Sequence, residues 1–277
     1  MTSLDQKVEA RGDAVGFFDE SADDYEGKHY GDGVRSFMTV RQRRVLEFVD
    51  ALRLPAGTDT LDAGCGPGYL VEALAARGLR VKAMDAADGM LRQARARLEA
   101  AKPTYPVEFS VGNIEQLPYD DGSFDLACST GVIEYLDGDA TVLAEFHRVL
   151  RPGGHLVLPV TNVWSPANCL DLVVEPMKRQ RWLRAPFNAV WERLGQPPVL
   201  PRHFQVRKHR PQQFRESLAA AGFTLRDEIY FHFLPVPRPF NRLAPALCDA
   251  IGEQMEARAR GWLAPAGEGF LTISRRD

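Results

Sequence analysis

Short apolar runs alternate with amphipathic segments through the middle of this chain. The apolar runs predict strands at residues 58–63, 80–84, 107–111, 124–129 and 155–160. The segments between them predict helices at residues 69–77, 89–101 and 139–150. This alternation predicts a parallel sheet with helices on both faces. Right-handed crossovers then bring the carboxyl ends of the strands to one edge of the sheet.

Further elements are expected on both sides of this region. Phe17 to Tyr25 and Phe37 to Leu52 predict two N-terminal helices. Thr224 to Phe233 and Gly269 to Ser274 predict a final pair of strands, and a helix is expected from Asn241 to Arg260. No internal repeat or low-complexity segment interrupts this order.

The stretch from Thr161 to about Gly222 is far longer than an ordinary connection between two strands. It is rich in aromatic residues and contains a proline cluster around Pro197 and Pro198. We expect it to form a helical cap over the open end of the sheet. A helix over residues 211–221 then returns the chain to the sheet.

Three glycines follow the first predicted strand, in the run Leu61-Asp-Ala-Gly-Cys-Gly-Pro-Gly-Tyr-Leu70. Glycine allows the backbone to turn sharply and lets a ligand approach the main chain. The spacing is G-x-G-x-G, whereas a dinucleotide site has G-x-G-x-x-G, and Tyr69 takes the place of that third glycine. Asp62 would repel a pyrophosphate and suits a cofactor with an ammonium group.

An acidic residue also ends the second predicted strand. Asp85 follows Asp62 by 23 positions, a spacing at which a carboxylate can accept the ribose hydroxyls of a nucleoside. Asp88 is a candidate N-cap for the next helix, and Met90 is placed to pack against an adenine face.

Two later segments extend the same pattern. Asn113 and Ile114 follow the third strand, where the amide can contact the edge of an adenine and the isoleucine can lie on its ring. Pro152-Gly153-Gly154 follows the predicted helix 139–150, and it predicts a turn into the fifth strand.

These segments, in this order, resemble the class I S-adenosylmethionine-dependent methyltransferases. They are most similar to the group that includes the ubiquinone/menaquinone-biosynthesis and related small-molecule and lipid methyltransferases. The resemblance covers roughly residues 40–160, and Glu134-Tyr135 departs from it, because many relatives carry Glu-His there. The cofactor-binding residues that we expect are Asp62, Gly64, Cys65, Gly66, Gly68, Asp85, Ala86, Met90, Asn113, Ile114 and Ser129.

The resemblance also implies the fold. We expect an α/β protein with a doubly wound, seven-stranded, mostly parallel sheet, the Rossmann-like methyltransferase fold, whose last strand is antiparallel. The expected parts are an N-terminal helical lid (1–52), a cofactor-binding core (53–160), a helical acceptor cap inserted after strand five (161–210) and a C-terminal completion of the sheet (211–277).

The cofactor implied is S-adenosyl-L-methionine, whose sulfonium makes its methyl group electrophilic. Catalysis can then come largely from holding an acceptor in line with that methyl group. A general base is needed only where the acceptor keeps its proton. The candidates are Tyr25, His29 and Tyr30 in the lid segment, and Glu134 and Tyr135 after the fourth strand.

The predicted cap is strongly basic. Residues 177–215 hold ten basic residues and one acidic residue, a net charge of +9, so the rest of this −3 chain carries −12. This asymmetry indicates an anionic partner, either an acceptor with a carboxylate or phosphate or an anionic membrane surface. Alternatively, it is a solvated basic face that neutralises the acidic remainder within a dimer. The acceptor-binding candidates are Trp164, His203, Arg207 and His232.

The composition is that of an ordinary globular enzyme. Of the 277 residues, 45% are hydrophobic and 26% are charged. The four cysteines have no metal-binding spacing, so we expect no metal. The N-terminus lacks the apolar core of a signal peptide, and we expect a cytoplasmic protein with peripheral membrane contact as a second option. No recognised nucleic-acid fold accompanies the basic residues.

We therefore expect methyl transfer to a small or lipid-like acceptor, with O-methylation favoured over N- or C-methylation. One alternative is an NAD-dependent dehydrogenase. Another is a cofactor-sensing protein of the same fold that has no acceptor pocket. The sequence leaves a monomer and a homodimer equally open.

Overall fold

The protein is described by a computed structural model. The described residues are 14–22, 36–103, 106–195, 198, 206–236, 240–257 and 260–277.

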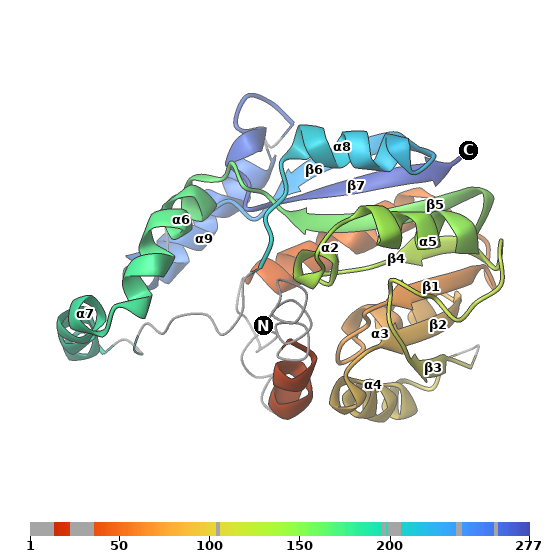
Figure 1. Ribbon diagram of the computed structural model, residues 1–277, viewed down its shortest axis with the longest axis horizontal. Helices are drawn as coiled ribbons and strands as arrows, with labels where there is room; N and C mark the ends of the chain where they lie inside the picture. The colour runs from red at the N-terminus through yellow and green to blue at the C-terminus, as the bar shows by residue number, and fades with distance from the viewer. Residues whose placement is uncertain are drawn as a thin grey trace, which may run out of the picture.

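One seven-stranded sheet organises the described residues, in the order β3-β2-β1-β4-β5-β7-β6 (Figure 1). The strands are β1 (Asp59–Ala63), β2 (Arg80–Asp85), β3 (Glu108–Val111), β4 (Phe124–Cys128), β5 (Leu150–Thr161), β6 (Phe223–Phe231) and β7 (Gly269–Arg276). The first five are parallel, and β7 runs antiparallel to both β5 and β6. The predicted fold class is confirmed, including the antiparallel last strand.

Helices cover both faces of the sheet. α2 (Phe37–Ala51), α3 (Tyr69–Ala76) and α4 (Asp88–Ala101) contribute to one apolar cluster, through residues such as Val45, Leu74 and Leu91. α5 (Ala140–Val149) and α8 (Pro211–Ala220) contribute to a second cluster, which contains Phe146 and Phe214. The strands between them are buried on both faces, which explains their continuous apolar runs.

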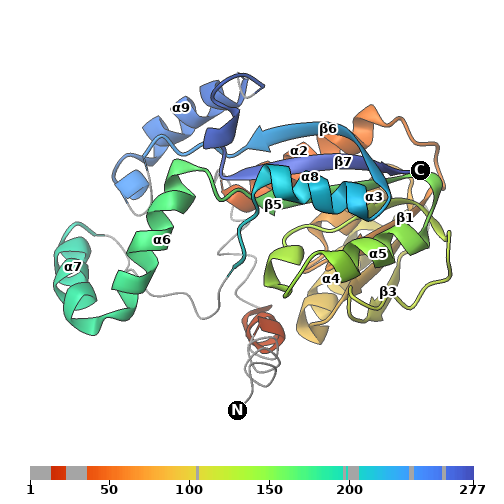
Figure 2. The ribbon, with the colours of Figure 1, turned by 45° about the horizontal axis from the view of Figure 1, so that its top comes forward.

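The remaining helices lie beyond one end of the sheet. A helix over residues 14–22 packs beside α4, through Ala22 against Met90. α6 (Pro166–Arg179) and α7 (Arg181–Arg193) follow β5, and η2 (Phe240–Leu243) and α9 (Pro245–Ala257) follow β6. Figures 1 and 2 both show α6, α7 and α9 projecting together past the end of β5. Within the described residues, no helix is both long enough and apolar enough to cross a membrane.

Two local predictions were wrong. Pro152, Gly153 and Gly154 lie inside β5, which begins at Leu150 directly after α5. They bulge out of the ladder, because Phe124 pairs with Leu150 whereas Leu126 pairs with His155, and Gly153 has a φ of +83°.

The N-cap of α4 is Ala87 rather than Asp88. Asp88 is the first helical residue, and its carboxylate pairs with Arg92 one turn later. The amide of Gly89 instead donates to Oδ1 of Asp19, 2.5 Å away, from the helix over residues 14–22. A carboxylate from a distant segment therefore supplies the cap.

Candidate functional site

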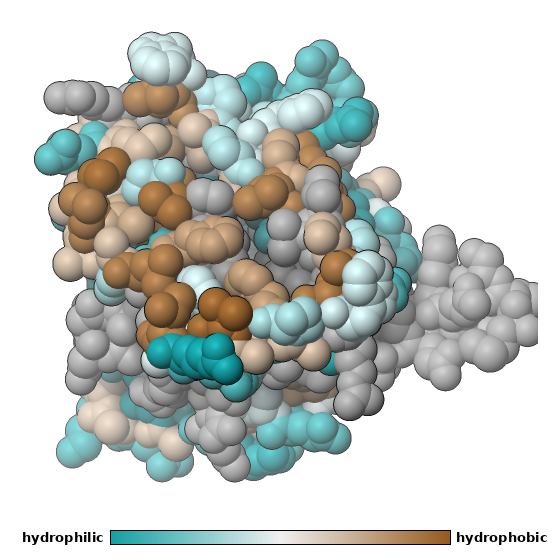
Figure 3. Space-filling model, turned by 90° about the vertical axis from the view of Figure 1, so that its left-hand side faces the viewer, coloured by the Kyte–Doolittle hydropathy of each residue, from teal (hydrophilic) through white to brown (hydrophobic). Residues whose placement is uncertain are grey.

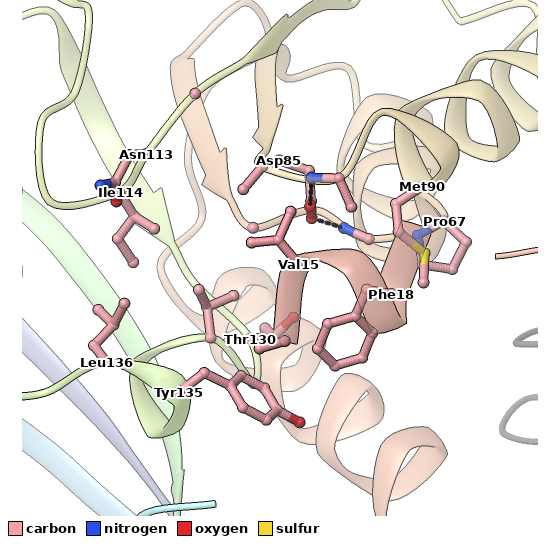
Figure 4. Close-up of a pocket in the computed structure, with 18 of the residues that line it drawn as sticks. Val15, Phe18, Pro67, Asp85, Met90, Asn113, Ile114, Thr130, Tyr135 and Leu136 are labelled. Carbon is pink, nitrogen blue, oxygen red and sulfur yellow. Dashed lines mark hydrogen bonds between the residues drawn. The ribbon is translucent and has the colours of Figure 1, made fainter. Parts of the chain in front are cut away.

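A cavity of about 340 Å³ lies at the carboxyl ends of β1, β2 and β4. The strand order reverses between β1 and β4, and such a reversal is where open α/β sheets bind ligands. The volume is within the usual range for a small-molecule pocket. Figure 4 shows its walls, with Asp85 and Met90 on one side and Asn113, Ile114 and Leu136 on another.

The glycine loop after β1 forms the floor of the cavity. Gly64, Gly66 and Gly68 have φ angles of +79°, +54° and +83°, in the left-handed region that favours glycine. A Cβ at Gly64 would overlap the side chain of Val132, whereas a Cβ at Gly66 would meet no atom within 4 Å. The loop is therefore pressed against the segment after β4 at Gly64 and open to the cavity at Gly66.

This difference predicts unequal effects of two matched substitutions. Gly64→Ala combines left-handed strain with the overlap on Val132, so we expect it to destabilise the fold by about 2–4 kcal/mol. Gly66→Ala adds strain alone, so we expect a loss of about 1–2 kcal/mol. Denaturant unfolding measures both values, and equal losses would contradict the close packing at Gly64.

Asp85 ends β2 and lines the cavity. Its Oδ2 accepts a hydrogen bond from the Gly66 amide at 2.8 Å, and its Oδ1 accepts one from the Ala87 amide at 2.9 Å (Figure 4). Burial raises the pKa of this carboxyl, and hydrogen bonds from the backbone amides around it oppose that rise. Each oxygen retains a further lone pair, so the carboxylate can accept hydrogen bonds from ligand hydroxyl groups while it stays bonded to the Gly66 and Ala87 amides.

Asp62 lies beneath the glycine loop rather than on the cavity wall. Leu61 and Ala63 belong to the cluster under α5 and α8, and side chains alternate along a strand, so Asp62 points to the opposite face, under α2. It is fully buried, and neither carboxylate oxygen has a hydrogen-bond partner among the described residues. Burial, reinforced by the negative charge of Asp85, raises the pKa of Asp62 to about 8.

Arg41 of α2 supplies a positive charge that the sequence analysis missed. It is only 6% exposed, lines the cavity, and makes no hydrogen bond or ion pair to a described residue. Its guanidinium lies 5.8 Å from the centre of the Phe37 ring and against Gly131, where a Cβ would overlap it. Its charge lowers the pKa of Asp62, although less than burial raises it.

The wall opposite the glycine loop follows β3. Ile114 is 5% exposed, and Asn113 also lines the cavity. The side-chain oxygen of Asn113 accepts the amide of Glu115 at 3.0 Å, so its carbonyl shapes the turn. Met90 is buried where α4 and the helix over residues 14–22 meet, and it contributes a thioether to the wall.

An apolar rim closes the other side of the cavity. Val15 and Phe18 come from the helix over residues 14–22, and Val132, Tyr135 and Leu136 come from the segment after β4. The rings of Phe18 and Tyr135 meet edge to face, with their centroids 5.3 Å apart. Figure 4 shows the two rings side by side at the rim.

The two candidate bases after β4 occupy different environments. η1 (Ile133–Tyr135) presents Tyr135 to the cavity, whereas Glu134 is buried behind it. Oε1 of Glu134 accepts the amide and the hydroxyl of Thr161, each at 3.1 Å. Glu134 therefore joins this turn to the end of β5. Tyr25, His29 and Tyr30 lie outside the described residues.

Of the candidate acceptor residues, the three that the structure describes do not line the cavity. Arg207 donates to the carboxylate of Asp139 at 2.5 Å and to the carbonyl of Ile133 at 2.9 Å, which ties it to η1, and Trp164 is exposed. His232 is buried, with Nδ1 2.6 Å from Oε2 of Glu268. His203 lies outside the described residues.

The expected cofactor residues divide into two groups. Those that line the cavity are Gly64, Gly66, Asp85, Ala86, Met90, Asn113 and Ile114. Those that lie behind its wall are Asp62, Cys65, Gly68 and Ser129. The second group comes from the inward-facing positions of β1, its loop and the end of β4.

The chemistry of these residues fits S-adenosylmethionine. Its amino-acid end carries an ammonium and a carboxylate, and the site holds a buried carboxylate and a buried guanidinium, each without a partner among the described residues. Its ribose offers two hydroxyls to Asp85. The apolar surfaces of Ile114 and Met90 suit an adenine ring.

The comparisons with known proteins agree with this assignment. Residues 61–158 match the methyltransferase domain family. Over 98 residues, the chain is 42% identical to the malonyl-[acyl-carrier protein] O-methyltransferase of Serratia marcescens, covering 35% of this chain and 36% of that protein. Over 129 residues, it is 33% identical to the ubiquinone biosynthesis O-methyltransferase of Xanthomonas axonopodis pv. citri, covering 46% and 53%.

These curated relatives are matched over about a third to a half of their own length. Among solved structures, the chain resembles the magnesium protoporphyrin IX methyltransferase of Synechocystis PCC 6803, which has S-adenosylhomocysteine bound. The TM-score is 0.61 at 15% identity, over 97% of this chain and all of that one. At that identity the likeness establishes the fold.

Proposed function

Because the chain carries an S-adenosylmethionine-dependent methyltransferase domain at residues 61–158, we propose that it transfers a methyl group to an oxygen of a hydrophobic, acidic small molecule or lipid-like acceptor. The observation that carries the cofactor side of this proposal is a pair of buried ionisable side chains without a hydrogen-bond partner among the described residues: Arg41 on the cavity wall and Asp62 behind the glycine loop. Arg41 and the ionised form of Asp62 complement the two charges of an amino acid.

Different residues of the site bind different parts of the cofactor. Asp85 and the amide of Gly66 form one hydrogen-bonded unit that accepts the ribose, so the loop and the sugar position each other. When bound, S-adenosylmethionine supplies a sulfonium whose methyl group is open to in-line attack. Phe18 and Tyr135 cover the cavity rim and limit the access of water.

The cavity wall favours an acceptor that loses its proton easily. Among the described lining residues, those with ionisable side chains are Arg41, Asp85 and Tyr135. Asp85 already holds two backbone amides, and Glu134 is turned toward Thr161. A carboxylate oxygen needs no general base, because it has already lost its proton, whereas a phenol, an ammonium or a carbon acid does. This supports O-methylation over the N- and C-methylation alternatives.

The apolar rim and the basic cap support the rest of the acceptor's description. Val15, Phe18, Val132 and Leu136 present hydrocarbon at the cavity mouth, and the net charge of +9 over residues 177–215 favours an anionic group. The dehydrogenase alternative places a pyrophosphate at the glycine loop, which has the G-x-G-x-G spacing and follows Asp62 rather than matching a dinucleotide site.

The proposal is tested with methyl-labelled cofactor and a panel of alkylated acceptors that differ in their nucleophile. We expect labelled product from carboxylic acids and none from amines of matched chain length. Mass spectrometry identifies the methylated atom. Labelled amine products would overturn the O-methylation proposal. Tight binding of S-adenosylhomocysteine without transfer to any member of the panel would favour the cofactor-sensing alternative.

A further inference from the structure

The tryptophans of this chain are concentrated outside the methyltransferase domain. All four, Trp164, Trp182, Trp191 and Trp262, lie between residues 161 and 263. Three of them are 55%, 72% and 88% exposed, namely Trp164, Trp182 and Trp262. Tryptophan combines a large apolar ring with a polar N–H, and it is enriched where one surface is apolar and the other is wet.

One face of α7 is apolar and open to solvent. Phe187, Val190 and Leu194 recur at helical spacing, and Val190 and Leu194 are 58% and 55% exposed. Ala185, Ala189 and Glu192 share the other side of the helix and are exposed as well. A helix that leaves its apolar side in water lacks the partner that normally covers it.

This apolar face continues from α7 onto η2 and α9. Trp191 stacks on Phe187 with ring centroids 5.5 Å apart, and it meets the edge of Phe240 at 5.8 Å. Leu243 and Leu247, just beyond Phe240, are both more than half exposed. We call these residues the docking face: Phe187, Val190, Leu194, Phe240, Leu243 and Leu247. Figure 3 views the side of the molecule from which α6, α7 and α9 project, and it shows apolar side chains gathered there.

Positive charge accompanies the docking face. Arg193 ends α7, is exposed, and directly precedes Leu194 of the docking face. The segment that contains α7 carries +9, whereas the remainder of the chain carries −12. An exposed apolar helix face within a basic segment is typical of a helix lying in the headgroup region of a bilayer.

We propose that the docking face binds the surface of an anionic lipid bilayer. Its apolar side chains enter the boundary between headgroups and acyl chains, and the arginines pair with lipid phosphates. This face lies outside the cofactor cavity, so the proposal does not depend on methyl transfer.

The test measures vesicle binding without cofactor or acceptor. The intact chain is sedimented with vesicles of phosphatidylcholine alone and with vesicles that also contain phosphatidylglycerol. We expect binding to the anionic vesicles only, weakening as salt is raised. Val190→Glu is expected to weaken this binding about tenfold or more, because it places a charge in the apolar boundary.

Ala189→Glu is the matched control, since it adds the same charge to the next residue of the same exposed helix. We expect it to reduce binding much less than Val190→Glu, and both variants should keep the native circular dichroism spectrum. Equal losses would mean that charge alone drives binding, and would overturn the docking face. Absence of vesicle binding would also overturn it. A wild-type dimer that Val190→Glu converts to a monomer, without vesicle binding, would assign the face to a contact between two copies.

Discussion

Arg41→Met is expected to weaken the binding of S-adenosylhomocysteine by about ten- to a hundredfold, because hydrogen bonds to a charged group contribute about 1.5–3 kcal/mol. The guanidinium is buried at the cavity wall and has no carboxylate partner among the described residues. A ligand carboxylate is the group that would complete it. Isothermal titration calorimetry measures the loss directly.

The ligand itself provides the sharpest control for this prediction. Methylthioadenosine keeps the adenine, ribose and sulfur of the cofactor but lacks the amino-acid end. Its affinity should therefore be the same for Arg41→Met and for the wild type. Arg41→Lys should retain part of the affinity for S-adenosylhomocysteine, because it keeps the charge but loses the planar fork. Equal losses for both ligands would show that Arg41 only supports the shape of the cavity.

Arg41 illustrates what the sequence could not predict. Its helix was expected at residues 37–52 and is found at Phe37–Ala51. Within that helix, Arg41 is one of three arginines in four positions, and the sequence does not distinguish which of them turns inward. Arg43 and Arg44 bind Glu256, whereas Arg41 turns inward over Gly131. The Arg41 guanidinium fits there because Gly131, 90 positions later in the chain, has no side chain. This contact between distant residues exists only in the folded chain.

The strands of the core were predicted well because burial governs them. β1 pairs with β2 on one side and β4 on the other between layers of helices, so the apolar runs of these strands mark their positions within one or two residues. The orientation of Glu134 was harder to predict from the sequence. The motif places a carboxylate after β4, but neighbouring residues of a short turn point in different directions. The Glu134 side chain is held inward by hydrogen bonds from Thr161, at the far end of β5.

The acceptor residues were the least predictable part of the site. Arg207 and His232 were chosen for their chemistry, and each has an internal partner, Asp139 and Glu268 respectively. A sequence shows which side chains can bind an acceptor, but the partner that holds each of them depends on contacts between distant segments. The structure shows instead that Phe18 and Tyr135, more than a hundred positions apart in the sequence, meet at the cavity rim.

Asp62→Asn is expected to stabilise the free protein and to abolish tight cofactor binding. In the folded chain the pKa of Asp62 is raised from 3.8 to about 8, mainly by burial. Between these two values the folded state holds a proton that the unfolded state releases, so stability falls as pH rises. Asparagine removes this dependence, because its amide does not titrate. The stability gain of the variant over the wild type should therefore grow with pH.

Linkage sets the size of this effect. Each pH unit between the two pKa values changes the difference in unfolding free energy between Asp62→Asn and the wild type by about 1.4 kcal/mol. The stability gain of the variant should therefore increase by about 2–3 kcal/mol between roughly pH 6 and pH 8. Denaturant unfolding of both proteins at the two pH values measures it. A difference that does not change with pH would mean that Asp62 is already ionised and paired in the free protein.

Cofactor binding should show the opposite trend with pH. An ammonium group favours the ionised form of Asp62, so the affinity of the wild type for S-adenosylhomocysteine should rise toward about pH 8, by at most about tenfold per unit. In Asp62→Asn the affinity should be low and independent of pH over the same range, while methylthioadenosine still binds. The Asp62 carboxylate would then destabilise the protein without cofactor and attract the ammonium group of the bound cofactor. Such a trade-off between stability and binding is expected of a site that contains a buried charge.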